Sequence, residues 1–166
     1  MTDSIAVRDF IIRNKEQEIL GICRTCWWLI VLKLRKPVRI PGDMRDLLPK
    51  HPERLKENIV LDKIFITGNT VGKSSTYHVV YSDLDMNHHE NNINYLKWVL
   101  DDFEYSFRQK YRLGSIEINF LAEAIFGDEL VRNTVPGGEH EFLTKIINKK
   151  SLKPILSSKT KWLPKA

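Results

Sequence analysis

With 166 residues, the chain is long enough for one domain with a small appendage. Its apolar fraction of 42% and charged fraction of 28% are ordinary for a soluble globular protein. No apolar run approaches the ~18 residues that cross a bilayer, and the first residues lack the basic and apolar regions of a secretory signal, so we expect no membrane insertion and a cytoplasmic location. The net charge of +5 attracts anions, but the aromatic residues do not interleave with the lysines as stacking platforms would, so nucleic-acid binding is not expected.

The chain begins with a predicted β-hairpin. Residues 5–14 and 18–34 are rich in β-branched and aromatic side chains and predict its two strands. Cys23 and Cys26 lie in the second strand, where side chains three residues apart point to opposite faces, so a redox or zinc site is not expected there. Prolines and a glycine then interrupt the pattern, and residues 41–58 are predicted to be a linker with one short helix.

A strand pattern returns at residues 59–67 and leads into a loop that contains Gly68 and Gly72. A phosphate-binding loop needs four residues between its glycines and a helix after them, because the helix amides cradle the phosphate. Here three residues separate the glycines, and β-branched and aromatic residues follow. We therefore expect no nucleotide cofactor.

The stretch from residue 81 to 107 changes its period halfway. Polar residues first stand two apart, so in an extended chain they project to one side and can converge on one reacting atom: Asp83, Asp85, Asn87 and His89. An apolar stripe with helical spacing follows: Ile93, Leu96, Leu100, Phe103 and Phe107. This stripe predicts one amphipathic helix over residues 91–111.

Four more strands are predicted after the helix, over residues 115–124, 131–135, 139–148 and 154–162. A long helix followed by antiparallel strands indicates an α+β architecture, in which a sheet wraps around the helix.

The block that opens the predicted helix resembles one in the acyl-acyl carrier protein thioesterases. Their second hot-dog domain carries Ser-Asp-Leu-Asp-x-Asn-x-His-x-Asn-Asn-x-x-Tyr at the start of its central helix. The matching residues are Ser82, Asp83, Leu84, Asp85, Asn87, His89, Asn91, Asn92 and Tyr95. Glu90 departs from the pattern, because the family usually has an apolar residue there. The resemblance implies a hot-dog fold, an antiparallel sheet wrapped round one long helix.

The resemblance also reaches the N-terminal segment, which looks like the end of the family's first hot-dog domain. It implies that the chain is truncated at its N-terminus relative to the family. We expect a β-hairpin remnant of the first hot-dog domain over residues 1–40, a linker over 41–58, and a complete C-terminal hot-dog domain over 59–166.

Thioester hydrolysis needs an activated water, donors for the developing oxyanion and a proton for the leaving thiolate. Asp85 could activate the water, Asn87 offers amide N–H groups, and His89 transfers protons near neutral pH. The family places a further glutamate on the strand after the helix, which corresponds to Glu123. It often has a cysteine next, where this chain has Ala124, so a Cys-His nucleophile is not expected.

Two other interpretations concern the same residues. Asp85 and Asn87 are also good N-cap residues for the helix that follows. A calcium loop would need Gly and Glu at the positions of His88 and Asn94, and residues 88–90 lack the spacing of zinc ligands on one helical face. We therefore expect no metal and no cofactor.

Three functions remain. We expect hydrolysis of fatty acyl-acyl carrier protein to free fatty acid in fatty acid biosynthesis. The alternatives are a hot-dog thioesterase acting on acyl-coenzyme A, and a truncated, non-catalytic module that binds an acyl chain or a carrier protein.

Two basic clusters bear on the expected partner, an acidic acyl carrier protein bearing the fatty acyl thioester. Such clusters attract acidic proteins, although they can equally be solvated surface. The clusters are Lys33, Arg35, Lys36 and Arg39, and Lys145, Lys149, Lys150, Lys153, Lys159, Lys161 and Lys165.

We also expect a homodimer, because a two-stranded hairpin is marginal in water and its free edge invites pairing.

Overall fold

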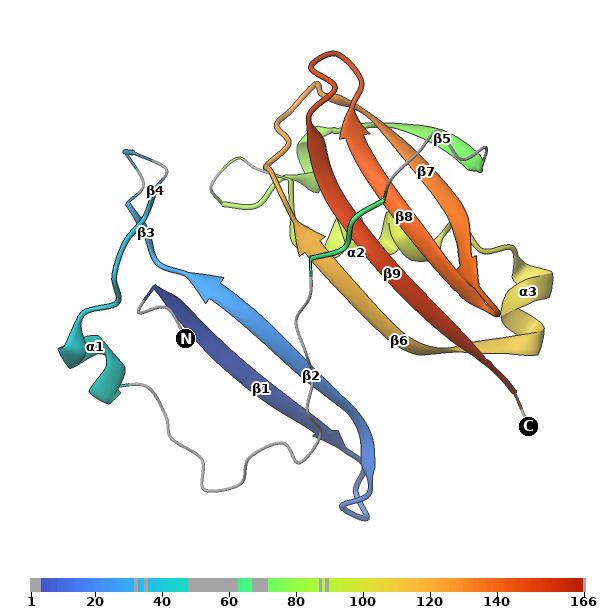
Figure 1. The fold of residues 1–166 in the computed structure, drawn as a ribbon, viewed down its shortest axis with the longest axis horizontal. Coiled ribbons are helices and arrows are strands. Elements are labelled where there is room, and N and C mark those ends of the chain that lie inside the picture. Colours follow the sequence, from blue (N-terminus) through green and yellow to red (C-terminus); the bar gives the residue numbers. More distant parts are fainter. Residues whose placement is uncertain are drawn as a thin grey trace. The chain divides into compact units, whose positions relative to one another are not determined.

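The structure is a computed structural model that describes residues 4–31, 33–34, 36–47, 63–66, 72–86, 88 and 90–165. The chain divides into two compact units, Met1–Leu61 and Asp62–Ala166. Figure 1 labels the elements of both units along the chain. Two predicted site residues, Asn87 and His89, and most of the strand predicted at 59–67 lie outside the described residues.

The N-terminal unit contains the predicted hairpin, formed by β1 (Ile5–Arg13) and β2 (Ile19–Trp28) in antiparallel register. An ion pair between Arg24 and Asp9 (2.7 Å) joins the two strands across one face. The second strand ends earlier than predicted, at Trp28, and the chain continues into a separate antiparallel pair, β3 (Ile30–Val31) and β4 (Lys36–Pro37). The short helix expected in the linker is α1 (Gly42–Leu47).

The C-terminal unit is built on a five-stranded antiparallel sheet among the described residues, with the order β5-β7-β8-β9-β6. The strands are β5 (Lys73–His78), β6 (Tyr111–Phe120), β7 (Glu129–Gly138), β8 (Glu141–Asn148) and β9 (Pro154–Pro164). The predicted strands after the helix are therefore present, with shifted ends. β5 and β6 form the two edges of the sheet.

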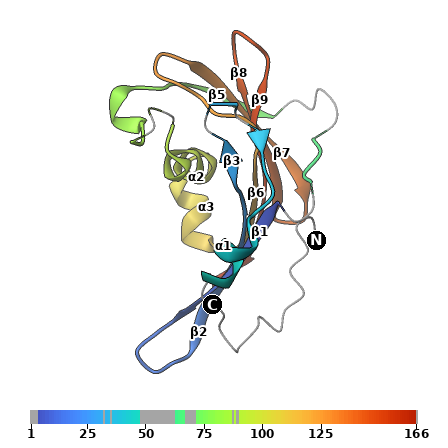
Figure 2. The same cartoon turned by 90° about the vertical axis from the view of Figure 1, so that its left-hand side faces the viewer.

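Helical segments cover one face of this sheet, as Figure 2 shows for α2 and α3. The prediction of one continuous helix over residues 91–111 is wrong. The chain forms α2 (Asn92–Leu100), an irregular turn, and α3 (Tyr105–Lys110), and Tyr111 already belongs to β6.

The helix ends at Leu100 because side chains from elsewhere take over its last carbonyl groups. The guanidinium of Arg132, on β7, donates to the Trp98 carbonyl and also to the Asp102 carboxylate. Arg108 donates to the Leu100 carbonyl. Asp102 is buried beside Arg132, and this ion pair fixes the turn between α2 and α3. Orphan carbonyls at a helix end need such partners.

The face of α2 that enters the core is rotated from the predicted one. Ile93 was expected on the buried stripe but is 49% exposed. Tyr95 and Val99, four residues apart, are buried instead, and Asn94 is buried beside them. Burying this face lets the Tyr95 hydroxyl accept a hydrogen bond from the Ala124 backbone N–H (3.2 Å).

The core of the unit lies between α2 and the sheet. Its buried members are Val79, Tyr95, Val99, Ala124, Leu130, Ile146, Ile155 and Leu156. A second group of aromatic rings packs where α3 meets β8 and β9, with Phe103 in contact with Trp162 (ring centroids 4.4 Å apart) and Phe142 (4.9 Å). Both groups hold the helical segments against the same face of the sheet.

The buried ion pair predicts a large stability effect at Asp102. In the Asp102→Ala variant, Arg132 stays buried without its carboxylate, so we expect the free energy of unfolding to fall by about 3–5 kcal/mol. The matched control is Asp101→Ala. The Asp101 side chain is 65% exposed, and its ion pair with Arg108 is long (3.5 Å) and open to solvent. Its loss should cost at most about 1 kcal/mol. Urea denaturation measures both, and equal losses in the two variants would contradict this account of the helix end.

Candidate functional site

The chain between β5 and α2 folds back on itself and forms the candidate site. It begins with a 3₁₀ turn, η1 (Tyr81–Asp83), and continues to an antiparallel bridge between Leu84 and Glu90. The Asp83 carboxylate accepts a hydrogen bond from the Val80 N–H (2.9 Å), and the Asp83 carbonyl accepts one from the Asn91 N–H (2.9 Å). Asp83 is therefore a structural residue of the turn.

Asp85 lies beyond η1, directly after the bridge residue Leu84, and is half-buried. The interpretation of Asp85 as the N-cap of α2 is wrong. Asn91 is the N-cap, because its side chain accepts the hydrogen bond from the Ile93 N–H (3.0 Å). Asp85 is thus not used for capping, and it takes part in a further interaction.

Glu123 lies on the segment between β6 and β7, and backbone contacts bring this segment to the Asp85 turn. The Glu90 N–H donates to the Ala124 carbonyl (3.0 Å), and the Ala124 N–H donates to the Tyr95 hydroxyl (3.2 Å). Burial raises the pKa of this Tyr95 hydroxyl, so it stays protonated. Ala124, at the family's cysteine position, is fully buried in the core.

Two of the four predicted site residues are therefore held on neighbouring segments. Asp85 is one residue from the bridge that includes Glu90, and Glu123 is one residue from the carbonyl that Glu90 binds. The roles of Asn87 and His89 stay predictions. The arrangement provides two carboxylates, one half-buried and one exposed, near the N-terminal end of α2.

Glu90 is the residue whose importance the sequence did not reveal. Its side chain is buried, and among the described residues neither carboxylate oxygen has a hydrogen-bond partner. Burial is the main cause that raises its pKa to about 7; the Asn94 side chain opposes the shift, and the nearby Asp83 carboxylate adds to it. The one signal in the sequence was that an acidic residue interrupts the motif at this position.

Exposed apolar side chains flank both carboxylate-bearing segments. They are Val80, Tyr81 and Met86 before α2, Phe120 at the end of β6, and Leu121, Ile125 and Phe126 after it. Met86 is 96% exposed and Phe126 is 63% exposed. Clusters of exposed apolar residues mark surfaces that another molecule covers.

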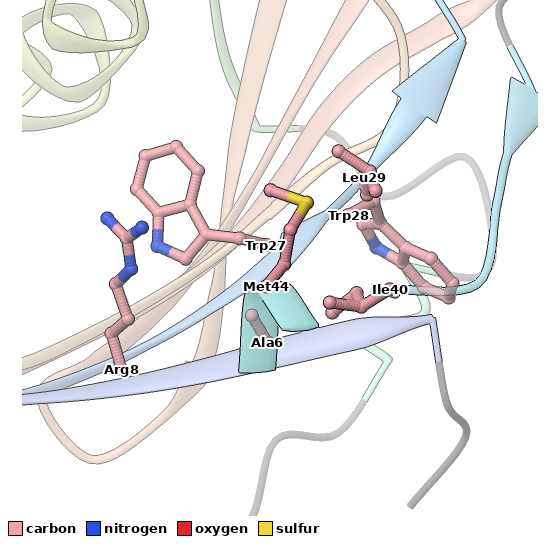
Figure 3. Close-up of a pocket in the computed structure, with 7 residues that line it drawn as sticks. All are labelled: Ala6, Arg8, Trp27, Trp28, Leu29, Ile40 and Met44. Carbon is pink, nitrogen blue, oxygen red and sulfur yellow. The ribbon is translucent and has the colours of Figure 1, made fainter. Parts of the chain in front are cut away.

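The N-terminal unit has an apolar cavity of its own, with a volume of about 220 Å³. Figure 3 shows the side chains that line it: Ala6, Arg8, Trp27, Trp28, Leu29, Ile40 and Met44. The Arg8 guanidinium lies 5.3 Å from the centre of the Trp27 ring and supplies the one charge of the lining. The chemistry of this lining suits an apolar ligand or an apolar partner surface.

Several lysines of the C-terminal basic cluster are paired. Lys149 contacts Glu129, and both Lys159 and Lys161 lie 3.3 Å from Glu141, whose pKa they lower through hydrogen bonds. Lys150 and Lys153 are exposed at the turn between β8 and β9.

Within the described part of the chain, no group of three His, Cys, Asp or Glu side chains could hold a metal ion. None of the described helices combines the length and the apolar character needed to span a membrane.

The chain is similar to known proteins in both architecture and sequence. The sequence model of the family described as "Acyl-ACP thioesterase C-terminal domain" matches residues 67–162. An acyl-ACP thioesterase structure from Bacteroides thetaiotaomicron superposes with a TM-score of 0.83 at 28% identity, over 98% of this chain and 65% of that one. The 12:0-ACP thioesterase of Umbellularia californica has the same TM-score at 21% identity, over 99% and 65%.

Curated relatives give the same result at the level of sequence. The dodecanoyl-[acyl-carrier-protein] hydrolase of Cinnamomum camphora is 26% identical over 95% of this chain and 44% of its own length. The oleoyl-acyl carrier protein thioesterase of Coriandrum sativum is 28% identical over 84% and 41%. The chain thus spans less than half the length of these relatives, both named as chloroplastic.

The C-terminal unit, with its antiparallel sheet and one covered face, has the hot-dog fold, as predicted. The chain belongs to the acyl-ACP thioesterase family, through the family's C-terminal domain. The division into a remnant of a first domain, a linker and a complete second domain stays a prediction, as does a cytoplasmic location.

Proposed function

We propose that this chain hydrolyses fatty acyl-acyl carrier protein thioesters and releases free fatty acid and carrier protein in fatty acid biosynthesis. The observation that carries the proposal is the attachment of both carboxylate-bearing segments to Glu90, through Leu84 and Ala124. Asp85 and Glu123 thereby lie on neighbouring segments, and Asn91, not Asp85, caps the helix. Membership of the thioesterase family supports the same activity.

The proposed reaction is attack of water on the thioester carbonyl. A carbon–oxygen bond forms, the carbon–sulfur bond breaks, the carboxylate base takes the proton of the water, and the leaving thiolate takes a proton. Asp85 or Glu123 acts as the base, the Asn87 amide stabilises the oxyanion, and His89 assists the proton transfer. A water nucleophile agrees with Ala124, which offers no nucleophilic group.

Removing either proposed base should abolish most of the activity. We expect Asp85→Asn and Glu123→Gln each to lower kcat/KM by about 10²-fold or more, because a positioned base typically contributes this much. Hydrolysis of acyl-carrier protein is measured together with circular dichroism, which should show an intact fold.

The control is Glu117→Gln, which makes the same chemical change at an exposed position on β6. It should leave the rate within about a factor of two, as expected for a surface substitution that touches no reacting group. Near-normal turnover in both site variants would remove the proposed mechanism. Parallel assays with acyl-coenzyme A decide between a carrier-protein and a coenzyme A substrate.

A second candidate function is acyl binding without turnover, and the cavity in the N-terminal unit favours it. Its lining of Trp27, Trp28 and Met44 matches the apolar character of an acyl chain. If neither thioester is hydrolysed but a fatty acid quenches tryptophan fluorescence, this function replaces the first. Loss of that quenching in a Met44→Asp variant would locate the bound chain in the cavity.

We propose that the carrier protein docks through the basic clusters, because an acidic protein is attracted to exposed lysines and arginines. Lys36 on β4 and Lys153 before β9 are exposed representatives of the two clusters. The lysines paired with Glu129 and Glu141 are less suited, because their charge is already partly neutralised.

Carrier docking should therefore depend on salt and on exposed lysines. The association rate should fall as salt shortens the Debye length from ~30 to ~8 Å. Charge reversal at Arg35 and Lys36 should weaken carrier binding more than it lowers turnover of a small thioester, and Lys153→Glu tests the other cluster in the same way. Stopped-flow binding gives the rates, and salt-independent kinetics would argue against electrostatic docking.

We also propose a homodimer in which the exposed apolar side chains beside the site meet the same surface of a second copy. A two-fold interface brings one surface patch against itself, so residues such as Phe126 would contact their own counterparts. The exposure of Met86 and Phe126 in a single chain supports this assembly.

Light scattering over a concentration series tests the dimer. We expect a particle of twice the 19.4 kDa chain mass, and Phe126→Ser should shift the equilibrium toward the monomer, because it removes apolar area from the interface. Leu152→Ser is the control, since Leu152 is 71% exposed but lies at the turn between β8 and β9. A soluble 19.4 kDa particle at every concentration would refute the proposal.

A further inference from the structure

Glu90 is the residue at which the two halves of the candidate site are joined. On one side it pairs with Leu84, which directly precedes Asp85. On the other side its N–H donates to the carbonyl of Ala124 (3.0 Å), which directly follows Glu123. A change in the position of Glu90 would therefore move both carboxylates.

The side chain of Glu90 is an unusual group for this position. It is 5% exposed, and neither carboxyl oxygen has a hydrogen-bond partner among the described residues. The nearby Asn94 amide donates to the Asp83 carbonyl (3.1 Å) and accepts from Lys97 (3.3 Å), and its interaction with the Glu90 carboxyl lowers the pKa of Glu90 by less than burial raises it. A buried carboxylate with so little compensation is strongly disfavoured, whereas the neutral acid is tolerated.

The charged groups around Glu90 favour the neutral form as well. Asp83 from η1 raises its pKa, and Tyr95 on α2 is close enough to interact electrostatically with Glu90, Glu123 and Asp128. Lys97 is the cation on this part of α2, and it is bound to Asn94. Ionised Glu90 would thus add a negative charge to a site that already carries several acidic groups.

These effects give a definite direction of pH dependence. Burial raises the pKa of Glu90 from 4.5 to about 7 in the folded chain. Neutral Glu90 therefore contributes its full stabilisation to the folded arrangement below pH 4.5. This stabilisation is lost as the pH rises through about 7.

We propose that Glu90 is a positioning residue for the hydrolysis: its neutral carboxyl keeps the Leu84 bridge and the Ala124 hydrogen bond closed, and its ionisation opens them and separates Asp85 from Glu123. The proposal rests on the proposed thioesterase function. It assigns no bond-making step to Glu90, and it makes this residue the cause of an alkaline loss of activity.

The pH profile of hydrolysis tests the proposal. The wild-type kcat/KM should decline on the alkaline side, by about tenfold per pH unit once Glu90 is ionised, as for a single titrating group. Glu90→Gln and Glu90→Leu cannot ionise, so their profiles should lack this decline up to pH 9, whatever their absolute rates. Glu117→Gln should keep the wild-type profile. An unchanged alkaline decline in both Glu90 variants would overturn the proposal.

Amide hydrogen exchange provides a readout that does not need turnover. Between pH 6 and 8.5, after correction for the intrinsic exchange rate, protection of the Glu90 N–H and the Ala124 N–H should fall at least about tenfold in the wild type, as expected when local opening becomes more favourable. In Glu90→Gln it should stay constant. Equal protection at both pH values in the wild type would also overturn the proposal.

The two readouts separate this inference from the proposed function. If the wild type hydrolyses no thioester, or if Asp85→Asn and Glu123→Gln remain active, the proposed function fails, and hydrogen exchange alone decides whether Glu90 controls the closed arrangement. If hydrolysis follows the proposed mechanism but neither the profile nor the protection depends on Glu90, only this inference fails.

Discussion

The buried contact between Arg132 and Asp102 is the interaction on which the C-terminal unit depends. Arg132 extends from β7 and reaches the phenol of Tyr77 on β5 (2.5 Å), the carbonyl of Trp98 and the carboxylate of Asp102. It thereby links two neighbouring strands to the end of α2. A buried guanidinium must have such partners, so the position of the helix end is set by the sheet and not by the helix sequence.

The fixed C-terminal end of α2 also determines which residues of this helix face the core. With its last carbonyls bound, α2 presents Tyr95 and Val99 to the core, and Tyr95 holds the Ala124 segment through its hydroxyl. The candidate site therefore owes its assembly to packing at the opposite end of the helix. The assembly of the site therefore depends on residues outside the motif at residues 82–95.

The sequence predicted the elements of the fold well, because hydrophobic periodicity reports local structure directly. The hairpin, the helix start and the strands after residue 114 followed from it. It failed at the helix break, since the apolar stripe continues through Phe103 while the group that ends the helix, Arg132, lies about thirty residues further along the chain. The rotation of α2, which exposes Ile93, likewise depends on packing that no local pattern contains.

The candidate site was predictable only through its motif. The spacing of Asp85 was equally compatible with capping, and the structure was needed to assign the cap to Asn91. Glu90 was visible as a departure from the motif, but its burial could not be known, because it depends on packing against the distant segment that contains Ala124.

The order of strands in the sheet has a consequence for how the chain is made. β6 is an edge strand whose neighbour is β9, so it has no place in the sheet until the C-terminal strand has been synthesised. Both segments of the candidate site leave the ribosome before that strand does. During translation, β6 must therefore wait unpaired, and the nascent chain is open to chaperones and to misassociation until β9 arrives.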